Sequence, residues 1–120
     1  MNILVVDDSS AMRMMVVRTL RQAGIDKKNV AQAEDGAIAL EAIRKKAPDL
    51  VLADWNMPNM TGLELLEALR AENIDVTFGF ITTESSKEMR QKATDAGAQF
   101  LISKPFTLDS FEKVLSTIMN

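Results

Sequence analysis

The chain has 120 residues, of which 47% are hydrophobic and 26% are charged, and its net charge is −3. These values are typical of one soluble globular domain, and the acidic balance argues against nucleic-acid binding. With no cysteine and no histidine, the chain cannot contain disulfides, thiolate metal sites, Ser-His-Asp triads or phosphohistidine. No apolar run approaches the roughly 20 residues that cross a bilayer. We therefore expect a cytoplasmic protein that binds neither nucleic acid nor membrane.

Five short apolar runs alternate along the chain with segments of helical length. The runs are ILVV at 3–6, VAQA at 30–33, LVLA at 50–53, TFGFI at 77–81 and FLI at 100–102. The first and third are apolar throughout, as strands buried on both faces are, whereas the polar run at 30–33 suits a sheet edge. This alternation predicts an α/β fold of (βα)5 type, a doubly wound parallel five-stranded sheet with helices on both faces.

Helical periodicity follows each run, at 10–23, 36–46, 61–71, 86–96 and from 108 to 118. The segment 86–96 offers few apolar residues and predicts a loosely held helix. The residues expected to face the core are Met12, Met15, Val16, Leu20, Ala23, Ala39, Leu40, Ile43, Leu63, Leu66, Leu69, Met89, Ala93, Ala96, Leu108, Phe111, Leu115 and Ile118.

Right-handed crossovers and helices on both faces favour the strand order 2-1-3-4-5. This is the known order of flavodoxin-like sheets, not one derived from these residues alone. Ligands of such sheets bind beyond the carboxyl ends of the strands, where the strand order reverses. Here that point lies between the first and third strands.

Complementary chemical groups meet at that point. The first strand ends in Asp7 and Asp8, and the third ends in Asp54. The fourth strand ends in Thr82, and Lys104 follows the fifth. Each residue alone suits an ordinary turn or helix cap. Together they predict a functional site, because four strand ends bring acid, hydroxyl and amine to one place.

The charges suggest a chemistry. Two carboxylates about 5 Å apart repel by roughly 3 kcal/mol at an effective dielectric of about 20, so the cluster binds a proton or a cation. Oxygen ligands suit Mg²⁺ or Mn²⁺, and we expect Asp8 and Asp54 to hold it, with Asp7 acting through water. Ionised Asp54 can then attack phosphorus and carry an acyl phosphate. The metal and Lys104 neutralise charge on the moving group, and Thr82 donates its hydroxyl to it.

A set of short motifs in this chain resembles the landmarks of the response-regulator receiver family, in the same order. The motifs are DD at 7–8, ADWNMP at 53–58, Gly62, TTE at 82–84, AGA at 96–98 and KPF at 104–106. The resemblance covers the whole chain, so we expect residues 1–120 to form one receiver domain. It is strongest to the single-domain chemotaxis members of the family. The resemblance implies a phosphorylation-switched binding module that catalyses only its own phosphorylation and dephosphorylation.

The resemblance also implies roles for single residues. Asp54 is the phosphoacceptor. Lys104 contacts the phosphoryl group, and its peptide bond to Pro105 is cis. Thr82, not Thr83, is the switch hydroxyl, because its separation from Lys104 matches the family. Asn56 and Glu84 occupy the two positions that tune hydrolysis, and their identities imply a short-lived phosphoryl group. The implied metal ligands are Asp7, Asp8, Asp54 and the backbone carbonyl of Asn56.

One position departs from the family. Three residues before the lysine, where Tyr or Phe usually acts as a switch, this chain has Leu101. Phe100 lies on the opposite face of the strand and cannot substitute for it. Either a smaller movement of Leu101 or movement of the loop after the fourth strand would carry the signal. We expect the partner surface within residues 86–119, on the fourth helix, fifth strand and fifth helix.

The resemblance implies a histidine kinase as phosphodonor, an output partner such as a flagellar motor or kinase component, and a monomer. Alternatives are a phosphate sink or relay intermediate, or one domain of a larger regulator. A small aspartyl-phosphate phosphatase of the haloacid dehalogenase type fits poorly, because it needs D-x-D on the first strand and an acid where Asn56 stands. A flavodoxin-like cofactor binder also fits poorly, since DDSSAM places two acids where an anion would bind.

Overall fold

Five parallel strands form one sheet in this computed structural model, which describes residues 1–83 and 86–119. The order is β2-β1-β3-β4-β5, so the predicted order is confirmed and β2 lies at an edge. β4 and β5 each extend one residue beyond the predicted run. The strands are β1 Ile3–Val6, β2 Val30–Ala33, β3 Leu50–Ala53, β4 Thr77–Thr82 and β5 Phe100–Ser103.

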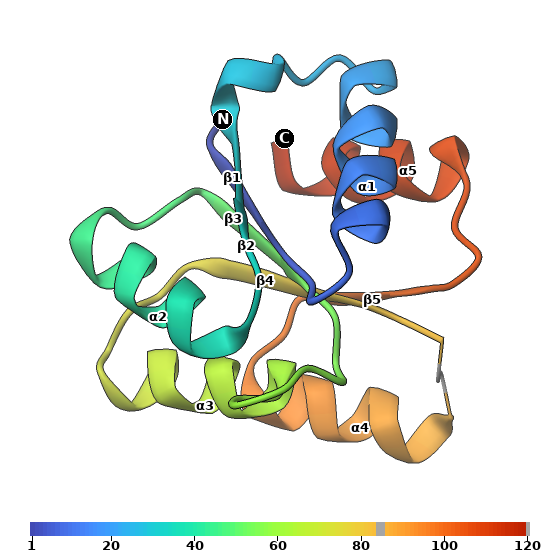
Figure 1. Cartoon of the computed structure of the whole chain (residues 1–120). Helices are drawn as coiled ribbons and strands as arrows, with labels where there is room; N and C mark the ends of the chain where they lie inside the picture. The colour runs from blue at the N-terminus through green and yellow to red at the C-terminus, as the bar shows by residue number, and fades with distance from the viewer. Residues whose placement is uncertain (84–85, 120) are drawn as a thin grey trace.

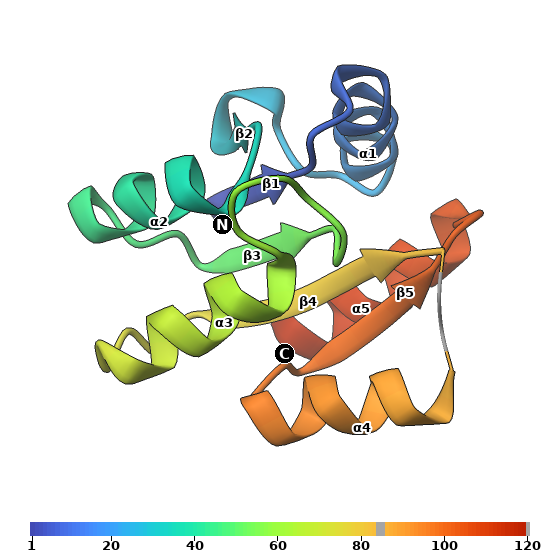
Figure 2. The same ribbon diagram turned by 60° about the horizontal axis from the view of Figure 1, so that its bottom comes forward.

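Helices cover both faces of the sheet (Figures 1 and 2). α1 and α5 lie on one face, and α2, α3 and α4 lie on the other. Each face has its own apolar cluster, because the buried strands send alternate side chains to opposite sides. The helices are α1 Ser10–Gln22, α2 Gly36–Lys45, α3 Gly62–Ala71, α4 Lys87–Ala96 and α5 Leu108–Met119, with a short 3-10 helix η1 at Lys27–Asn29.

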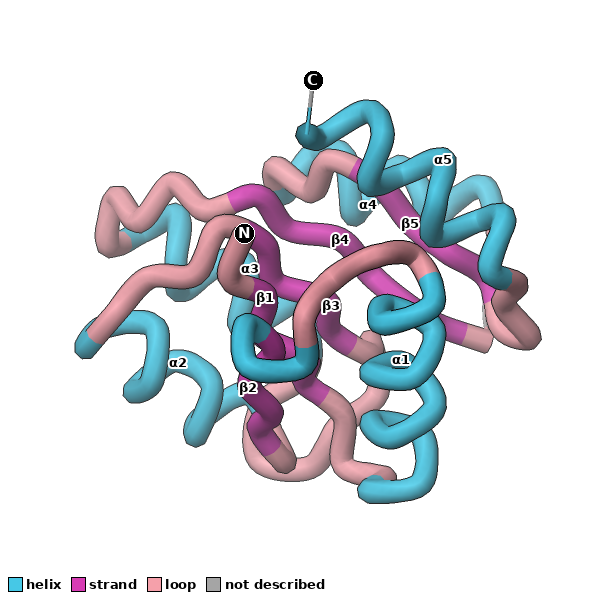
Figure 3. Tube along the Cα trace, turned by 90° about the horizontal axis from the view of Figure 1, so that it is seen from above, coloured by secondary structure: helices cyan, strands magenta, loops and turns pink. Residues whose placement is uncertain are grey.

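The register of the sheet brings the ends of β1 and β3 level. Val6 pairs with Ala53, and the backbone N–H of Asp54 donates to the carbonyl of Val6 at 2.9 Å. Seen from above, the two strands run side by side in the centre of the sheet (Figure 3). The residues that follow these strands therefore emerge at the same height.

The prediction that Met15 and Leu108 lie in the core is wrong. Met15 is 51% exposed, because the buried side of α1 centres on Val16, Val17 and Leu20, and Met15 falls beyond its border. Leu108 is 36% exposed. Phe106, which precedes α5 in the chain, instead packs against Phe111 at a ring-centroid distance of 4.9 Å.

α4 is held by few contacts. Within residues 87–96, all of which the structure describes, Ala93 is the one buried side chain, so the predicted loose attachment is confirmed. Beyond the last turn of α4, Arg70 of α3 donates to the carbonyl oxygens of Ile74, Val76 and Gly97. In the described part of the chain, no helix is long and apolar enough to span a membrane.

Candidate functional site

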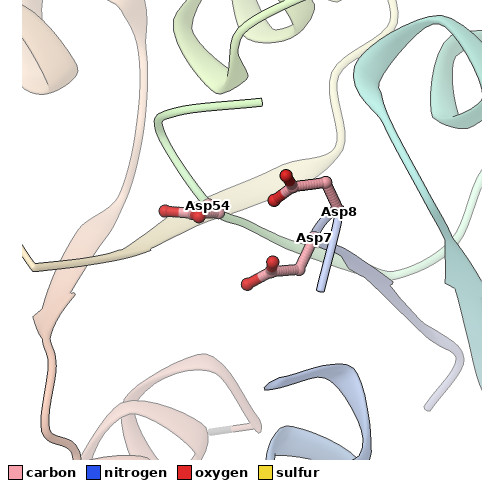
Figure 4. A group of neighbouring side chains, drawn as sticks. All are labelled: Asp7, Asp8 and Asp54. Atoms are coloured by element: carbon pink, nitrogen blue, oxygen red, sulfur yellow. The ribbon is translucent and has the colours of Figure 1, made fainter. Parts of the chain in front are cut away.

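Three carboxylates gather at the carboxyl end of the sheet (Figure 4). Asp7 and Asp8 follow β1 and Asp54 follows β3, and one oxygen of each lies within 4.8 Å of the others. Asp7 is 4% exposed, Asp54 is partly buried and Asp8 is exposed. The helix cap that follows β1 is Ser9, whose side chain accepts from the backbone N–H of Met12. The capping role considered for the two acids is therefore filled by another residue.

Lys104 follows the edge strand β5, and its side chain reaches this cluster. Its Nζ lies 3.4 Å from Asp7 Oδ2 and 3.5 Å from Asp54 Oδ2, and its side chain is 11% exposed. Its backbone N–H donates to the carbonyl of Thr82, which ties the end of β5 to the end of β4. The peptide bond between Lys104 and Pro105 is cis.

The charges around Asp54 oppose one another. Burial raises the pKa of the Asp54 carboxyl, and the negative charge of Asp7 raises it further. The Lys104 ammonium lowers this pKa, as does the backbone N–H of Trp55, which donates to Asp54 Oδ1 at 2.8 Å. The balance is a raised pKa. A cation bound between the carboxylates would favour the ionised form.

The loop after β3 turns back sharply at Asp54. The N–H of Gly62 donates to the carbonyl of Trp55 at 2.9 Å. A Cβ at position 62 would collide with the carbonyl oxygen of Asp54, so this close approach requires glycine. The Trp55 ring packs against Phe80 at a centroid distance of 4.6 Å. Asn56 is exposed at the top of the loop.

The remaining predicted site residues lie along the same edge. Thr82 ends β4 and is fully buried, whereas Thr83 is exposed. Leu101 packs against the cluster under α2, α3 and α4, and Phe100 packs against the opposite cluster, so the predicted opposite orientation is confirmed. Glu84 lies outside the described residues.

Sequence reasoning missed two residues near the site. Arg13 Nη1 donates to the backbone carbonyl of Asp7 at 2.6 Å, and its Nε donates to Gln32 Oε1. Asp35 begins α2 and accepts a hydrogen bond from Asn59 in the loop after β3. The sequence gives no signal for the contacts of Arg13 with Gln32 and of Asp35 with Asn59, since each joins segments that are distant along the chain.

The donor set fits a hard divalent cation. Three carboxylates supply oxygen ligands with open positions, as Mg²⁺ and Mn²⁺ prefer, and the exposed Asp8 leaves the cluster accessible. Lys104 offsets one of the three negative charges, so two remain for a cation to balance.

Known proteins resemble this chain over nearly its full length. The family model for the response regulator receiver domain matches residues 3–116. Chemotaxis protein CheY-3 of Vibrio cholerae serotype O1 is 39% identical, over 98% of this chain and 91% of its own length. Chemotaxis protein CheY of Pseudomonas aeruginosa is 36% identical, over 98% and 95%. The solved structure of Vibrio cholerae CheY4 superposes with a TM-score of 0.86 at 36% identity, over 98% and 97%.

Proposed function

Because this chain belongs to the response regulator receiver domain family, we propose that residues 1–120 form a stand-alone response regulator of two-component signalling. A histidine kinase transfers a phosphoryl group to Asp54 in a Mg²⁺-dependent reaction, and the modified chain binds an output partner. The chain catalyses only its own phosphorylation and dephosphorylation. The observation that carries this proposal is the convergence of three carboxylates and one lysine at one end of a flavodoxin/CheY-like sheet.

Asp54 supplies the nucleophile. One carboxylate oxygen attacks the phosphorus of the donor's phosphohistidine, and the O–P bond forms as the P–N bond breaks and its electron pair leaves with the imidazole. The N–H of Trp55 holds Oδ1, which leaves Oδ2, on the side of Lys104, to attack. The Lys104 ammonium lowers the pKa of Asp54, which favours the ionised carboxylate, and it neutralises charge on the phosphoryl oxygens. Thr82 donates its hydroxyl to the attached group.

The residues that would hold Mg²⁺ or Mn²⁺ are Asp7, Asp8, Asp54 and the backbone carbonyl of Asn56. The bound cation supplies charge neutralisation for the phosphoryl oxygens. Asp7 is oriented in advance, because its Oδ1 accepts from the N–H of Ser9 and its Oδ2 faces Lys104. Asn56 and Glu84 tune the attack of water that returns Asp54 to its free form.

The output surface comprises α4, β5 and α5, within residues 86–119. Its support is the weak attachment of α4, which a charge change at the neighbouring site can bias. Both relatives given above are named chemotaxis proteins, so the proposed partner is a flagellar motor or kinase component in the cytoplasm. We propose that the chain acts as a monomer.

Trp55 provides the first test, because it adjoins Asp54 and is the one tryptophan of the sequence. Its emission is followed while Mg²⁺ and then acetyl phosphate are added to the wild type, Asp54→Asn and Asp49→Asn. Asp49 is the matched control, since it is an exposed carboxylate that precedes β3 and contacts the N–H of Asn2. We expect saturable changes with metal and with donor in the wild type and in Asp49→Asn. In Asp54→Asn the response to donor disappears, and intact mass shows no added phosphoryl group.

The outcomes separate the alternatives. A response to metal without phosphorylation would leave the acidic cluster but refute the phosphoacceptor function. No response to either would refute the whole site. Phosphorylation without any change in hydrogen exchange across residues 86–119 would replace the output function with that of a phosphate sink or relay intermediate. Membership of the receiver family argues against the phosphatase alternative.

A further inference from the structure

Asp35 uses both of its carboxylate oxygens. Oδ1 accepts from the backbone N–H of Ile38 at 2.9 Å and so caps the start of α2. Oδ2 accepts from the side-chain amide of Asn59 at 3.0 Å. The residue is 8% exposed, and a buried aspartate needs hydrogen-bond partners such as these two. A cap needs only one oxygen, so the second bond points to another role.

Asn59 lies in the middle of the loop that joins β3 to α3. Its backbone is in the left-handed region, at φ 68°, a conformation that residues other than glycine seldom adopt. The next residue, Met60, presses on the first turn of α2. A Cβ at Gly36 would stand 2.8 Å from the carbonyl oxygen of Met60 and 2.9 Å from its Cβ. The loop is therefore docked against the beginning of α2 by one hydrogen bond and one close contact.

The same loop carries the proposed chemistry. It begins at Asp54, passes through Asn56, whose carbonyl is a proposed metal ligand, and reaches Asn59 three residues later. At its far end, Thr61 and Glu64 form the capping box of α3. The docked middle segment thus limits how far the carbonyl of Asn56 can move relative to Asp54.

We propose that Asp35 is a positioning residue: through its bond to Asn59 it fixes the β3–α3 loop, residues 54–61, and thereby sets the affinity of the acidic cluster for a divalent cation. This inference rests on the proposed function, because it requires a cation at Asp7, Asp8 and Asp54. Asp35 touches neither cation nor phosphoryl group and acts through Asn59. Without the bond the loop samples arrangements that cannot bind, and the apparent affinity is multiplied by the fraction of molecules that remain competent.

Two single substitutions remove this bond and keep the rest of each residue's role. Asp35→Ser retains a good helix cap but is too short to reach Asn59. Asn59→Gly retains the left-handed backbone but lacks the amide. Asp26→Ser is the matched control, since Asp26 caps η1 by the same kind of contact, to the N–H of Lys28. The probe is Mg²⁺ alone, its dissociation constant is read from Trp55 emission, and urea unfolding shows that each variant folds.

We expect Asp35→Ser and Asn59→Gly each to weaken Mg²⁺ binding by roughly 3- to 10-fold, at or below the lower end of the usual effect of residues that orient metal ligands. The double variant should bind no more weakly than either single variant, because both remove the same bond. Asp26→Ser should bind like the wild type. Exchanging the two side chains, as Asp35→Asn with Asn59→Asp, restores a donor opposite an acceptor and should recover most of the affinity.

Each outcome is decisive. A wild type that does not respond to Mg²⁺ refutes the proposed metal site itself. A responsive wild type with unchanged binding in Asp35→Ser and Asn59→Gly overturns the positioning role, even if both variants unfold at lower urea concentrations. Additive losses in the double variant would also overturn it, since the two residues would then act independently.

Discussion

The Nζ of Lys104 lies 3.5 Å from Oδ2 of Asp54, although one residue follows β5 and the other follows β3. β4 lies between these two strands, so the lysine side chain reaches across the end of a strand to the carboxylate. The same ammonium lies 3.4 Å from Asp7 Oδ2, and the carboxylate of Asp54 is held at Oδ1 by the N–H of Trp55. The lysine thus places a positive charge between two carboxylates that follow different strands.

Removing the charge at position 104 should raise the pKa of Asp54 further. Burial already raises this pKa, and the Lys104 ammonium is the largest influence that lowers it. Lys104→Gln removes that influence, whereas Lys104→Arg keeps a positive charge. The measurement is a pH titration of the Asp54 carboxyl carbon by NMR in the absence of metal. An unchanged or lower pKa in Lys104→Gln would contradict the assigned electrostatics.

Asp54→Asn should stabilise the fold at neutral pH in the absence of metal. The folded-state pKa of Asp54 lies above its usual value of 3.8, so the folded chain binds the proton more tightly than the unfolded chain does. Stability therefore falls as the pH rises from about 3.8 through the folded-state pKa. We expect a gain at pH 7, because burial of the ionised carboxylate is the largest cause of the raised pKa and the attraction to Lys104 offsets it only in part.

This gain should shrink toward zero below the unfolded-state value, where both states are protonated. Urea unfolding of wild type and Asp54→Asn across this pH range measures the difference, and Asp49→Asn controls for the loss of a carboxylate elsewhere. A gain that persisted unchanged in acid would mean that packing, not ionisation, is responsible.

Gly62→Ala should displace the loop after β3. The added Cβ meets the carbonyl of Asp54, which is backbone and cannot swing aside. We expect a loss of about 1–3 kcal/mol in the free energy of unfolding and a shifted Trp55 emission. Glu67→Ala, at an exposed position of the same helix, should change stability by no more than about 0.5 kcal/mol. Unaltered stability and emission in Gly62→Ala would show that the close approach is unimportant.

Leu101 should tolerate an aromatic replacement. A cavity of about 150 Å³ lies between α4 and β5, with Leu101, Ala93 and Thr94 in its lining. Leu101→Phe should therefore change the free energy of unfolding by less than about 1 kcal/mol, whereas a filled core would lose more. Phe111→Leu, in the filled cluster on the opposite face, should lose about 1–2 kcal/mol. Equal losses in the two variants would mean that the space beside Leu101 is not usable.

The strands were predictable because they carry strong local signals, whereas their order is the one known for flavodoxin-like sheets. β1 and β3 are apolar at every position, and parallel strands must bring Asp7, Asp8 and Asp54 to one edge. The position of Lys104 followed from the same rule. A periodic pattern predicts the apolar face of a helix, but it does not specify which residues from other segments pack against that face. Phe106, from outside the α5 pattern, packs against Phe111, whereas Leu108 within the pattern is exposed.

The loop contacts were not predictable for a different reason. Asp35 and Asn59 are 24 residues apart, and each has an adequate local explanation as a helix cap or a turn residue. Only the three-dimensional arrangement shows that one accepts from the other. Arg13 lies only six residues from Asp7, but an arginine near the start of a helix carries no sign that it will reach the carbonyl of Asp7.

The three carbonyl bonds of Arg70 anchor one end of α4. They fasten the chain just beyond the last turn of α4 to the end of α3 and the start of β4. The buried Ala93 lies at that same end, whereas Lys87 lies at the end that follows β4. The end of α4 that Arg70 anchors is the one that precedes β5. Toward Lys87 the helix is held through Arg90, which donates to Ser103 Oγ of β5 at 3.4 Å.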